Sequence, residues 1–261
     1  MRPATKYLLS VGLLSLGTLA LTSSCADNNS SLFVVGVIDI NSTSCVAKPD
    51  TTSALLAQGT LDVAFTTSYT AALLVGNQLT QQGSREQIRT ETSRISLRGA
   101  EVTLTTLDGR TLGNYSTVGT GFVDASAGDV PSYASMFVNL IPPSLGNNAA
   151  VQSAQVVLAK IRVFGDSLGN SSITSSELDF PITICKGCLV RYPADAADTT
   201  VAAGSGYLCS TAATTTQTTE AAPCVQGQDA PFACTFCSAA YKLCQDPKQN
   251  PSYSSGTATS P

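Results

Sequence analysis

The chain has 261 residues, of which 43% are hydrophobic, 6% aromatic and 12% charged, and its formal net charge is -4. An acidic, aromatic-poor chain without a basic stripe is poorly suited to bind nucleic acid, so we expect no nucleic-acid partner. The chain contains no histidine. This excludes His-dependent catalytic triads, imidazole metal sites and histidine proton shuttles.

The N-terminus has the pattern of an export signal. Arg2 and Lys6 precede Tyr7–Leu21, an uncharged apolar run of 15 residues. This run is too short to span a bilayer comfortably, and small residues follow it directly in Thr22–Ser24. Residues 1–24 are therefore predicted to be a signal peptide that directs the chain out of a bacterial cytoplasm.

Two cleavage sites compete after the signal. Small residues before Cys25 favour a lipoprotein peptidase, with the lipid on the Cys25 thiol, although Thr22 stands where the usual motif has Leu. Alternatively, Ser24-Cys25-Ala26 fits cleavage before Asp27 and free secretion. We expect lipidation, with the membrane as partner, residues 25–31 as a polar tether, and a location at the outer membrane or cell surface.

The remaining cysteines favour an oxidising compartment. Either cleavage removes Cys25 from the pairing pool, which leaves an even number in the mature chain. An even set in an exported chain is most simply explained by four disulfides. The disulfide candidates are Cys45, Cys185, Cys188, Cys209, Cys224, Cys234, Cys237 and Cys244.

Residues 32–185 show strand patterns throughout. Asp108-Gly109 is typical of a hairpin turn. Short strands at intervals of about 10–20 residues, separated by turn residues, predict an all-β fold, an Ig-like antiparallel β-sandwich. Strands are expected within 32–40, 61–65, 69–75, 94–98, 101–105, 117–123, 134–141, 156–164 and 177–185.

Two local details of this region can be tested. Pro181 lies inside the last strand and cannot donate a ladder hydrogen bond, which favours a sheet edge. Ser84–Thr92 carries the only helical pattern, and it could equally be a charged loop.

The chain changes character after the last strand. Residues 186–245 hold most of the cysteines and few large apolar side chains, so we expect a small disulfide-rich C-terminal module stabilised by cross-links. Residues 246–261 resemble a disordered tail. Because Cys45 is alone in the N-terminal half, its partner must be distant, and full pairing would tie the sandwich to the C-terminal module.

Val163–Leu168 contains the sequence Gly-Asp-Ser-Leu, the nucleophile motif of the GDSL esterases. In those enzymes a histidine takes the proton of the serine, here Ser167, and this chain has none. The motif also lies late in an all-β region rather than at the start of an α/β domain. We interpret it as a turn that ends a strand, and keep an exported serine hydrolase as the alternative function.

Cys185–Cys188 and Cys234–Cys237 are both CxxC motifs, with three interpretations. A zinc ribbon usually separates its two motifs by about 15–20 residues, far fewer than here. A redox pair needs its first cysteine at a helix N-terminus, whereas Cys185 ends a predicted strand. Structural disulfides need nothing further and are expected.

Arg85, Arg89, Arg94 and Arg98 form a short cluster that includes Glu86 and Glu91. A ligand-binding patch is one interpretation of this cluster. A solvated face of mixed charge is the simpler one, and we expect it.

Several segments resemble exported lipoproteins of myxobacteria. They are Asn77-Gln78-Leu79, Arg89-Thr90-Glu91-Thr92, Phe180–Leu189 and Cys224–Pro231. The resemblance covers most of the mature chain. It implies an outer-membrane or surface setting and brings no activity or site residues with it.

The sequence thus assigns no catalytic residues, no metal ligands and no cofactor. The expected function is that of a lipid-anchored cell-envelope protein that binds a protein or glycan partner or has a structural role.

Overall fold

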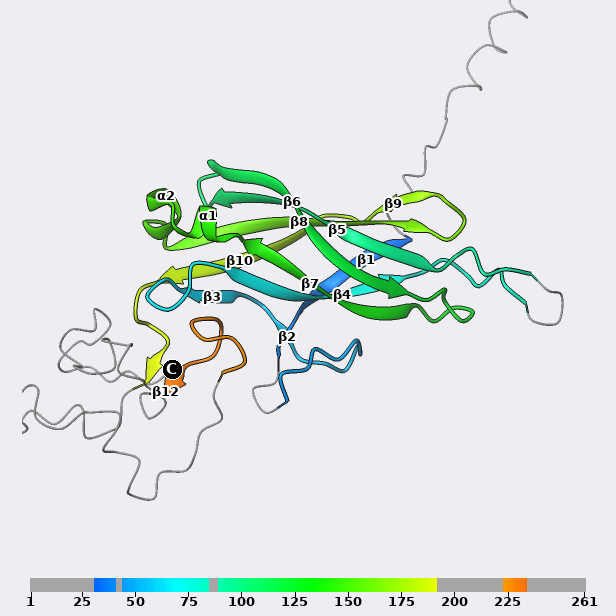
Figure 1. The fold of residues 1–261 in the computed structure, drawn as a ribbon, viewed down its shortest axis with the longest axis horizontal. Coiled ribbons are helices and arrows are strands. Elements are labelled where there is room, and N and C mark those ends of the chain that lie inside the picture. The colour runs from blue at the N-terminus through cyan, green and yellow to red at the C-terminus, as the bar shows by residue number, and fades with distance from the viewer. Residues whose placement is uncertain (1–30, 41–43, 85–88, 192–222, 234–261) are drawn as a thin grey trace, which may run out of the picture.

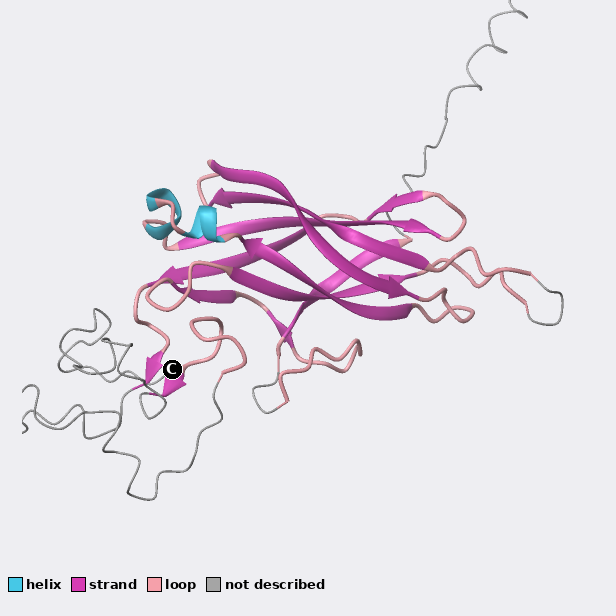
Figure 2. Cartoon of the chain, in the orientation of Figure 1, coloured by secondary structure: helices cyan, strands magenta, loops and turns pink. Residues whose placement is uncertain are grey.

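The computed structural model describes residues 31–40, 44–84, 89–191 and 223–233. Two β-sheets pack face to face and enclose the core (Figures 1 and 2). The two helices, α1 (Pro143–Gly146) and α2 (Ala149–Gln152), are single turns at one end of the sheets. Among the described residues, no helix is long and apolar enough to cross a membrane. The all-β sandwich predicted from the strand patterns is confirmed.

The smaller sheet has four strands. Its order is β2-β1-β4-β7, and every ladder in it is antiparallel. The strands are β1 (Leu32–Ile38), β2 (Leu55–Leu56), β4 (Tyr69–Asn77) and β7 (Ser132–Ile141).

The larger sheet has the order β3-β10-β8-β5-β6, and β9 pairs with the end of β8. Its ladders are antiparallel except that β3 runs parallel to β10, a pairing that hairpin patterns do not predict. The strands are β3 (Gly59–Asp62), β5 (Ile95–Thr106), β6 (Thr111–Val123), β8 (Val156–Ser167), β9 (Ser172–Thr174) and β10 (Leu178–Cys185).

A third, two-stranded sheet joins distant parts of the chain. In it, β11 (Val190–Arg191) runs parallel to β12 (Phe232–Ala233). The described part of the predicted C-terminal module is therefore connected both to the end of the sandwich sequence and, as shown below, to the sandwich itself.

The core is built from side chains that alternate along the strands. Ile95 and Leu97 face inward at the start of β5, and Val102 and Leu104 face inward further along. The inward positions change from odd to even numbers because the register shifts between Leu97 and Gly99, as a β-bulge allows. The two patterns expected as separate strands are thus one strand.

The prediction that Pro181 marks a sheet edge is half right. The second half of β10, Ile182–Cys185, pairs with β3 on one side, and its first two residues also pair with β8 on the other, so here β10 is an inner strand. Among the described residues, Leu178–Pro181 has a partner only in β8. Pro181 therefore lies in the part of β10 that has a neighbouring strand on one side only. Such a position can accommodate a residue that has no N–H to donate.

The described residues of Ser84–Thr92 form no helix, although the segment has a helical pattern. Ser84 and Arg89 form an antiparallel bridge, and Glu91 lies in a loop. The Glu91 carboxylate accepts hydrogen bonds from the backbone N–H groups of Gln82, Gly83 and Ser93, at 3.2, 2.9 and 2.6 Å. The charged-loop alternative is the correct one for these residues.

Candidate functional site

Residues 223–231, called the strap here, lie along the edge of the larger sheet. The backbone N–H of Asp62 donates to the carbonyl of Gly227 at 2.9 Å, and the N–H of Asp229 donates to Thr60 at 3.0 Å. Leu61 and Gln228 form an antiparallel bridge between them. The strap thus extends the larger sheet beyond β3, although about 165 residues separate the two segments.

Gln228 connects the strap to the smaller sheet. Its side-chain amide donates to the Thr70 carbonyl at 2.7 Å and accepts from the Thr70 N–H at 3.0 Å. This pair of bonds imitates the two bonds of a strand neighbour, and the side chain is buried. Among the described residues, no strand pairs with Thr70 on this side of β4, and the Gln228 side chain satisfies its backbone groups instead.

Asp229 makes the second side-chain contact of the strap. Its carboxylate accepts from the Tyr69 hydroxyl at 2.8 Å and from the Thr60 N–H at 2.8 Å. Its backbone φ of 58° is left-handed, a conformation that Asp and Asn adopt more readily than most residues. These bonds hold the strap against both sheets, because Thr60 belongs to β3 and Tyr69 to β4.

The surroundings of Asp229 favour its neutral form. Burial raises the pKa of the Asp229 carboxyl most strongly and the nearby Asp39 raises it further, while hydrogen bonds from Thr60, Tyr69 and Gln228 only partly oppose this. Burial, followed by the charge of Asp229, also raises the pKa of the Tyr69 hydroxyl above its usual range. The Tyr69 hydroxyl therefore stays protonated and can donate its hydrogen bond to Asp229.

Gly59 makes room for this contact. A Cβ atom on Gly59 would lie 2.6 Å from Cζ of the Tyr69 ring, well inside van der Waals distance. Only glycine lets the fully buried tyrosine stand against β3 and reach Asp229.

A disulfide fixes the start of the strap. Cys45 and Cys224 are bonded, with their Cα atoms 5.3 Å apart and 179 positions apart in the sequence. This is the covalent tie between the N-terminal half and the C-terminal segment that full pairing of the cysteines required.

A pocket of about 440 Å³ opens between the strap and the smaller sheet. The β1–β4 ladder ends beside this pocket, at Val37 and Leu73, and β2 pairs with the other side of β1. Its acidic lining residues are Asp39 and Asp229, and its apolar walls are Val37, Ile38, Ile40, Leu56, Ala71, Ala72, Val225, Ala230 and Pro231. Such a lining favours a neutral or cationic group and disfavours an anion.

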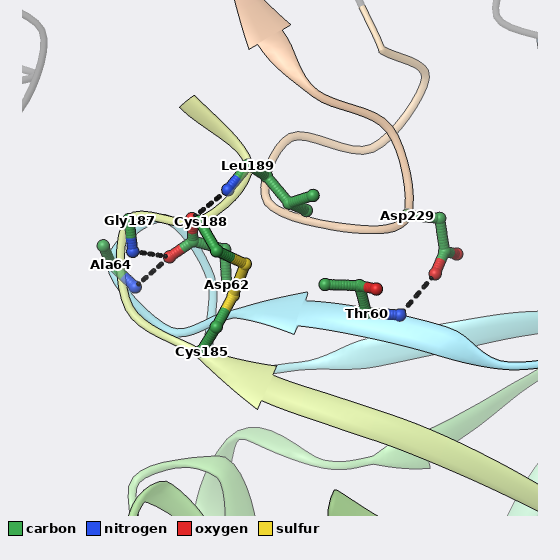
Figure 3. The surroundings of a disulfide bond; sticks show 8 residues. All are labelled: Thr60, Asp62, Ala64, Cys185, Gly187, Cys188, Leu189 and Asp229. Atoms are coloured by element: carbon green, nitrogen blue, oxygen red, sulfur yellow. Dashed lines mark hydrogen bonds between the residues drawn. A yellow bond between two sulfur atoms is a disulfide. The ribbon is translucent and has the colours of Figure 1, made fainter. Parts of the chain in front are cut away.

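The first CxxC motif closes a loop around a buried acid (Figure 3). Cys185 and Cys188 form a disulfide, and the fully buried Asp62 lies beside it. The Asp62 carboxylate accepts from the N–H groups of Gly187 at 2.6 Å, Leu189 at 2.9 Å and Ala64 at 3.0 Å. Asp62 thus holds the CxxC loop on the end of β3.

The zinc and redox interpretations meet specific obstacles here. The two sulfurs and an Asp62 oxygen lie within 4.8 Å of one another, which is a metal-binding spacing. However, a metal ligand must be a thiolate, and both sulfurs are in a disulfide. The redox interpretation lacks the helix N-terminus that lowers the pKa of a thiol, because Cys185 ends the strand β10. The geometry of this motif supports a structural cross-link.

Ser167 of the Gly-Asp-Ser-Leu sequence serves a turn. Its hydroxyl accepts from the Ser171 N–H at 3.1 Å, and Asn170 in the turn has a φ of 64°. A Cβ on Gly165 would clash with the Ser96 backbone, so this glycine permits the close approach of the paired strands β5 and β8. The motif residues are therefore explained by the end of β8.

The arginine cluster does not converge on one point in the described structure. Arg94 pairs with Asp124 at 2.9 Å and lies over the Phe122 ring, whereas Arg98 pairs with Asp166 at 3.1 Å. Arg89 is exposed, and Arg85 lies outside the described residues. These contacts fit a solvated face of mixed charge.

Five of the predicted residues lie outside the part of the chain that the structure describes. They are the lipidation candidate and four disulfide candidates: Cys25, Cys209, Cys234, Cys237 and Cys244.

No family model matches the chain, and no curated protein matches it significantly.

Sequence reasoning missed the residues that build this site. Asp62 follows a strand pattern without any distinguishing neighbour, and nothing local links Tyr69 or Gln228 to a partner about 160 residues away. The one available signal was the Cys224–Pro231 segment, which the resemblance had singled out and which forms most of the strap.

Proposed function

We propose that the protein is an exported, lipid-anchored component of the cell envelope, at the outer membrane or cell surface, with a structural or partner-binding role. The observation that carries this proposal is the apolar run Tyr7–Leu21 followed by small residues and Cys25. The two disulfides of the described chain support it, because such bonds persist outside the reducing cytoplasm.

A binding role agrees with the site at the strap. Its polar groups are satisfied by one another, and the pocket beside them offers apolar walls with two acidic residues. A cavity of this volume is at the lower end of the range that small ligands occupy. A neutral or cationic group carried by a protein or glycan partner suits it best.

The anchor is tested by replacing its residue. In cells, the wild type is expected in the detergent phase after phase separation, while Cys25→Ser moves to the aqueous phase. Ser24→Ala is the matched control, because it keeps a small residue before Cys25 and should leave the protein in the detergent phase. A wild-type protein found in the aqueous phase would contradict the proposal.

The non-catalytic role is tested against the hydrolase alternative. Purified wild type and Ser167→Ala are compared for hydrolysis of short-chain p-nitrophenyl esters. We expect no turnover above background in either protein, because Ser167 is bonded within its turn and the chain has no histidine. Turnover that disappears in Ser167→Ala would overthrow the non-catalytic assignment.

A further inference from the structure

At the end of the sandwich where β1 begins, called the N-terminal end here, several segments are joined by backbone hydrogen bonds (Figure 1). The N–H of Gln78 donates to Ser31 at 2.8 Å, and that of Ser126 donates to Leu79 at 2.8 Å. The turn after β8 joins the same surface, since the N–H of Leu168 donates to Arg94 at 2.8 Å.

Asn77 fixes these loops relative to one another. Its buried side-chain amide donates to the carbonyls of Ser93 and Asp124, at 2.8 and 2.9 Å, and its oxygen accepts from the Leu79 N–H at 2.9 Å. Three connecting segments are thus held by one residue, so the N-terminal end presents a defined surface.

Large apolar side chains are exposed on this surface. Leu168 in the turn after β8 is 51% exposed, and Val130 in the β6–β7 loop is 67% exposed. Phe122, near the end of β6, is 54% exposed, and the Arg94 guanidinium lies 4.7 Å from its ring centroid. Apolar side chains next to an arginine form a combination that suits the interface of a phospholipid bilayer.

The length of chain before β1 determines which end of the sandwich can reach a membrane. Six residues, 26–31, separate Cys25 from Leu32. Fully extended they span at most about 21 Å, and as a flexible chain roughly 13 Å. The opposite end, with the strap and the β5–β6 hairpin, lies further away by the length of β5, whose 12 residues measure about 40 Å.

We propose that the N-terminal end lies against the phospholipid surface in the anchored protein, with Leu168, Val130 and Phe122 entering the interface. The inference rests on the proposed lipid at Cys25. It places the strap and its pocket at the end that faces away from the membrane, where a partner can reach them.

The absence of tryptophan in the chain makes the test direct. Leu168→Trp introduces a single reporter at the N-terminal end. Leu107→Trp is the matched control, since Leu107 is 73% exposed in the hairpin at the opposite end. Both full-length, acylated variants are reconstituted in phosphatidylcholine vesicles whose acyl chains carry bromine near the headgroup, and acylation is verified by intact mass.

Contact with the interface predicts quenching at least about twofold stronger for Leu168→Trp than for Leu107→Trp. Val130→Trp provides a second reporter if Leu168→Trp does not fold. Equal quenching at both ends, stronger quenching at position 107, or none at either position with Cys25 acylated would overturn the inference alone. An unacylated Cys25 would overturn the proposed function, and the inference with it.

Discussion

Single acidic residues hold backbone segments of this protein together at positions where the sequence pattern indicated only a strand or a loop. Asp62 gathers three backbone N–H groups from two segments that lie about 125 positions apart. Glu91 gathers N–H groups of its own loop, and the pKa of its carboxyl stays low because these bonds outweigh the effect of burial. Asp229 binds the strap to both sheets. Among the described residues, these buried or half-buried carboxyl groups thus connect segments that are distant in the sequence or hold a loop together.

Asp62→Ala is expected to destabilise the fold strongly. It leaves three backbone N–H groups without acceptors in a buried place, at about 1–3 kcal/mol for each unsatisfied group. Asp62→Asn should lose less, because its single oxygen can still accept from Ala64 and Gly187. Urea denaturation measures both, with the exposed Asp179→Ala as control, and equal losses for Asp62→Ala and Asp179→Ala would contradict the role of Asp62.

Asp229 should give the protein a recognisable pH dependence. Its folded pKa is raised, so its contribution to stability is fully present below the ordinary Asp pKa of about 4 and is lost as pH rises through the folded value. Asp229→Asn keeps the left-handed conformation accessible but does not titrate. Unfolding free energies measured at pH 4 and pH 7 should therefore show the wild type losing ground to Asp229→Asn as pH rises. A difference that stays constant or grows in the other direction would refute this assignment.

At the scale of the elements, the sequence predicts strands that bury one face and misses pairings between segments that are distant in the sequence. Alternating side chains located most of the strands, because each strand buries one face and period two marks that face. The bulge between Leu97 and Gly99 hides the continuity of β5, since it changes which positions point inward. The parallel β3–β10 ladder and the strap carry no local signal, because their partners are more than 100 residues away.

The strap depends on its long-range disulfide. Replacing both Cys45 and Cys224 by serine removes a cross-link spanning 179 positions, worth about 5 kcal/mol from loop entropy. Replacing Cys185 and Cys188 opens a ring only three positions apart, worth about 2 kcal/mol on the same relation. Guanidinium denaturation of the two double variants compares them under identical conditions. A larger loss from the short ring would show that loop entropy does not govern these bonds.

At the scale of the whole molecule, the sandwich has two different ends. One carries the start of β1, the Asn77 junction and the exposed Leu168, Val130 and Phe122, and the other carries the strap, the pocket and the CxxC loop (Figure 1). A lipid on Cys25 would orient the molecule. A short tether would hold the N-terminal end at the membrane and leave the end with the strap accessible to a partner. The proposed orientation at the membrane therefore depends on that lipid.

The mass of the N-terminal peptide of the protein purified from its native membranes tests this dependence most directly. If the lipid anchor is present, the peptide begins at Cys25 and carries the added mass of acyl chains. A peptide that begins at Asp27, without any added mass, would contradict it.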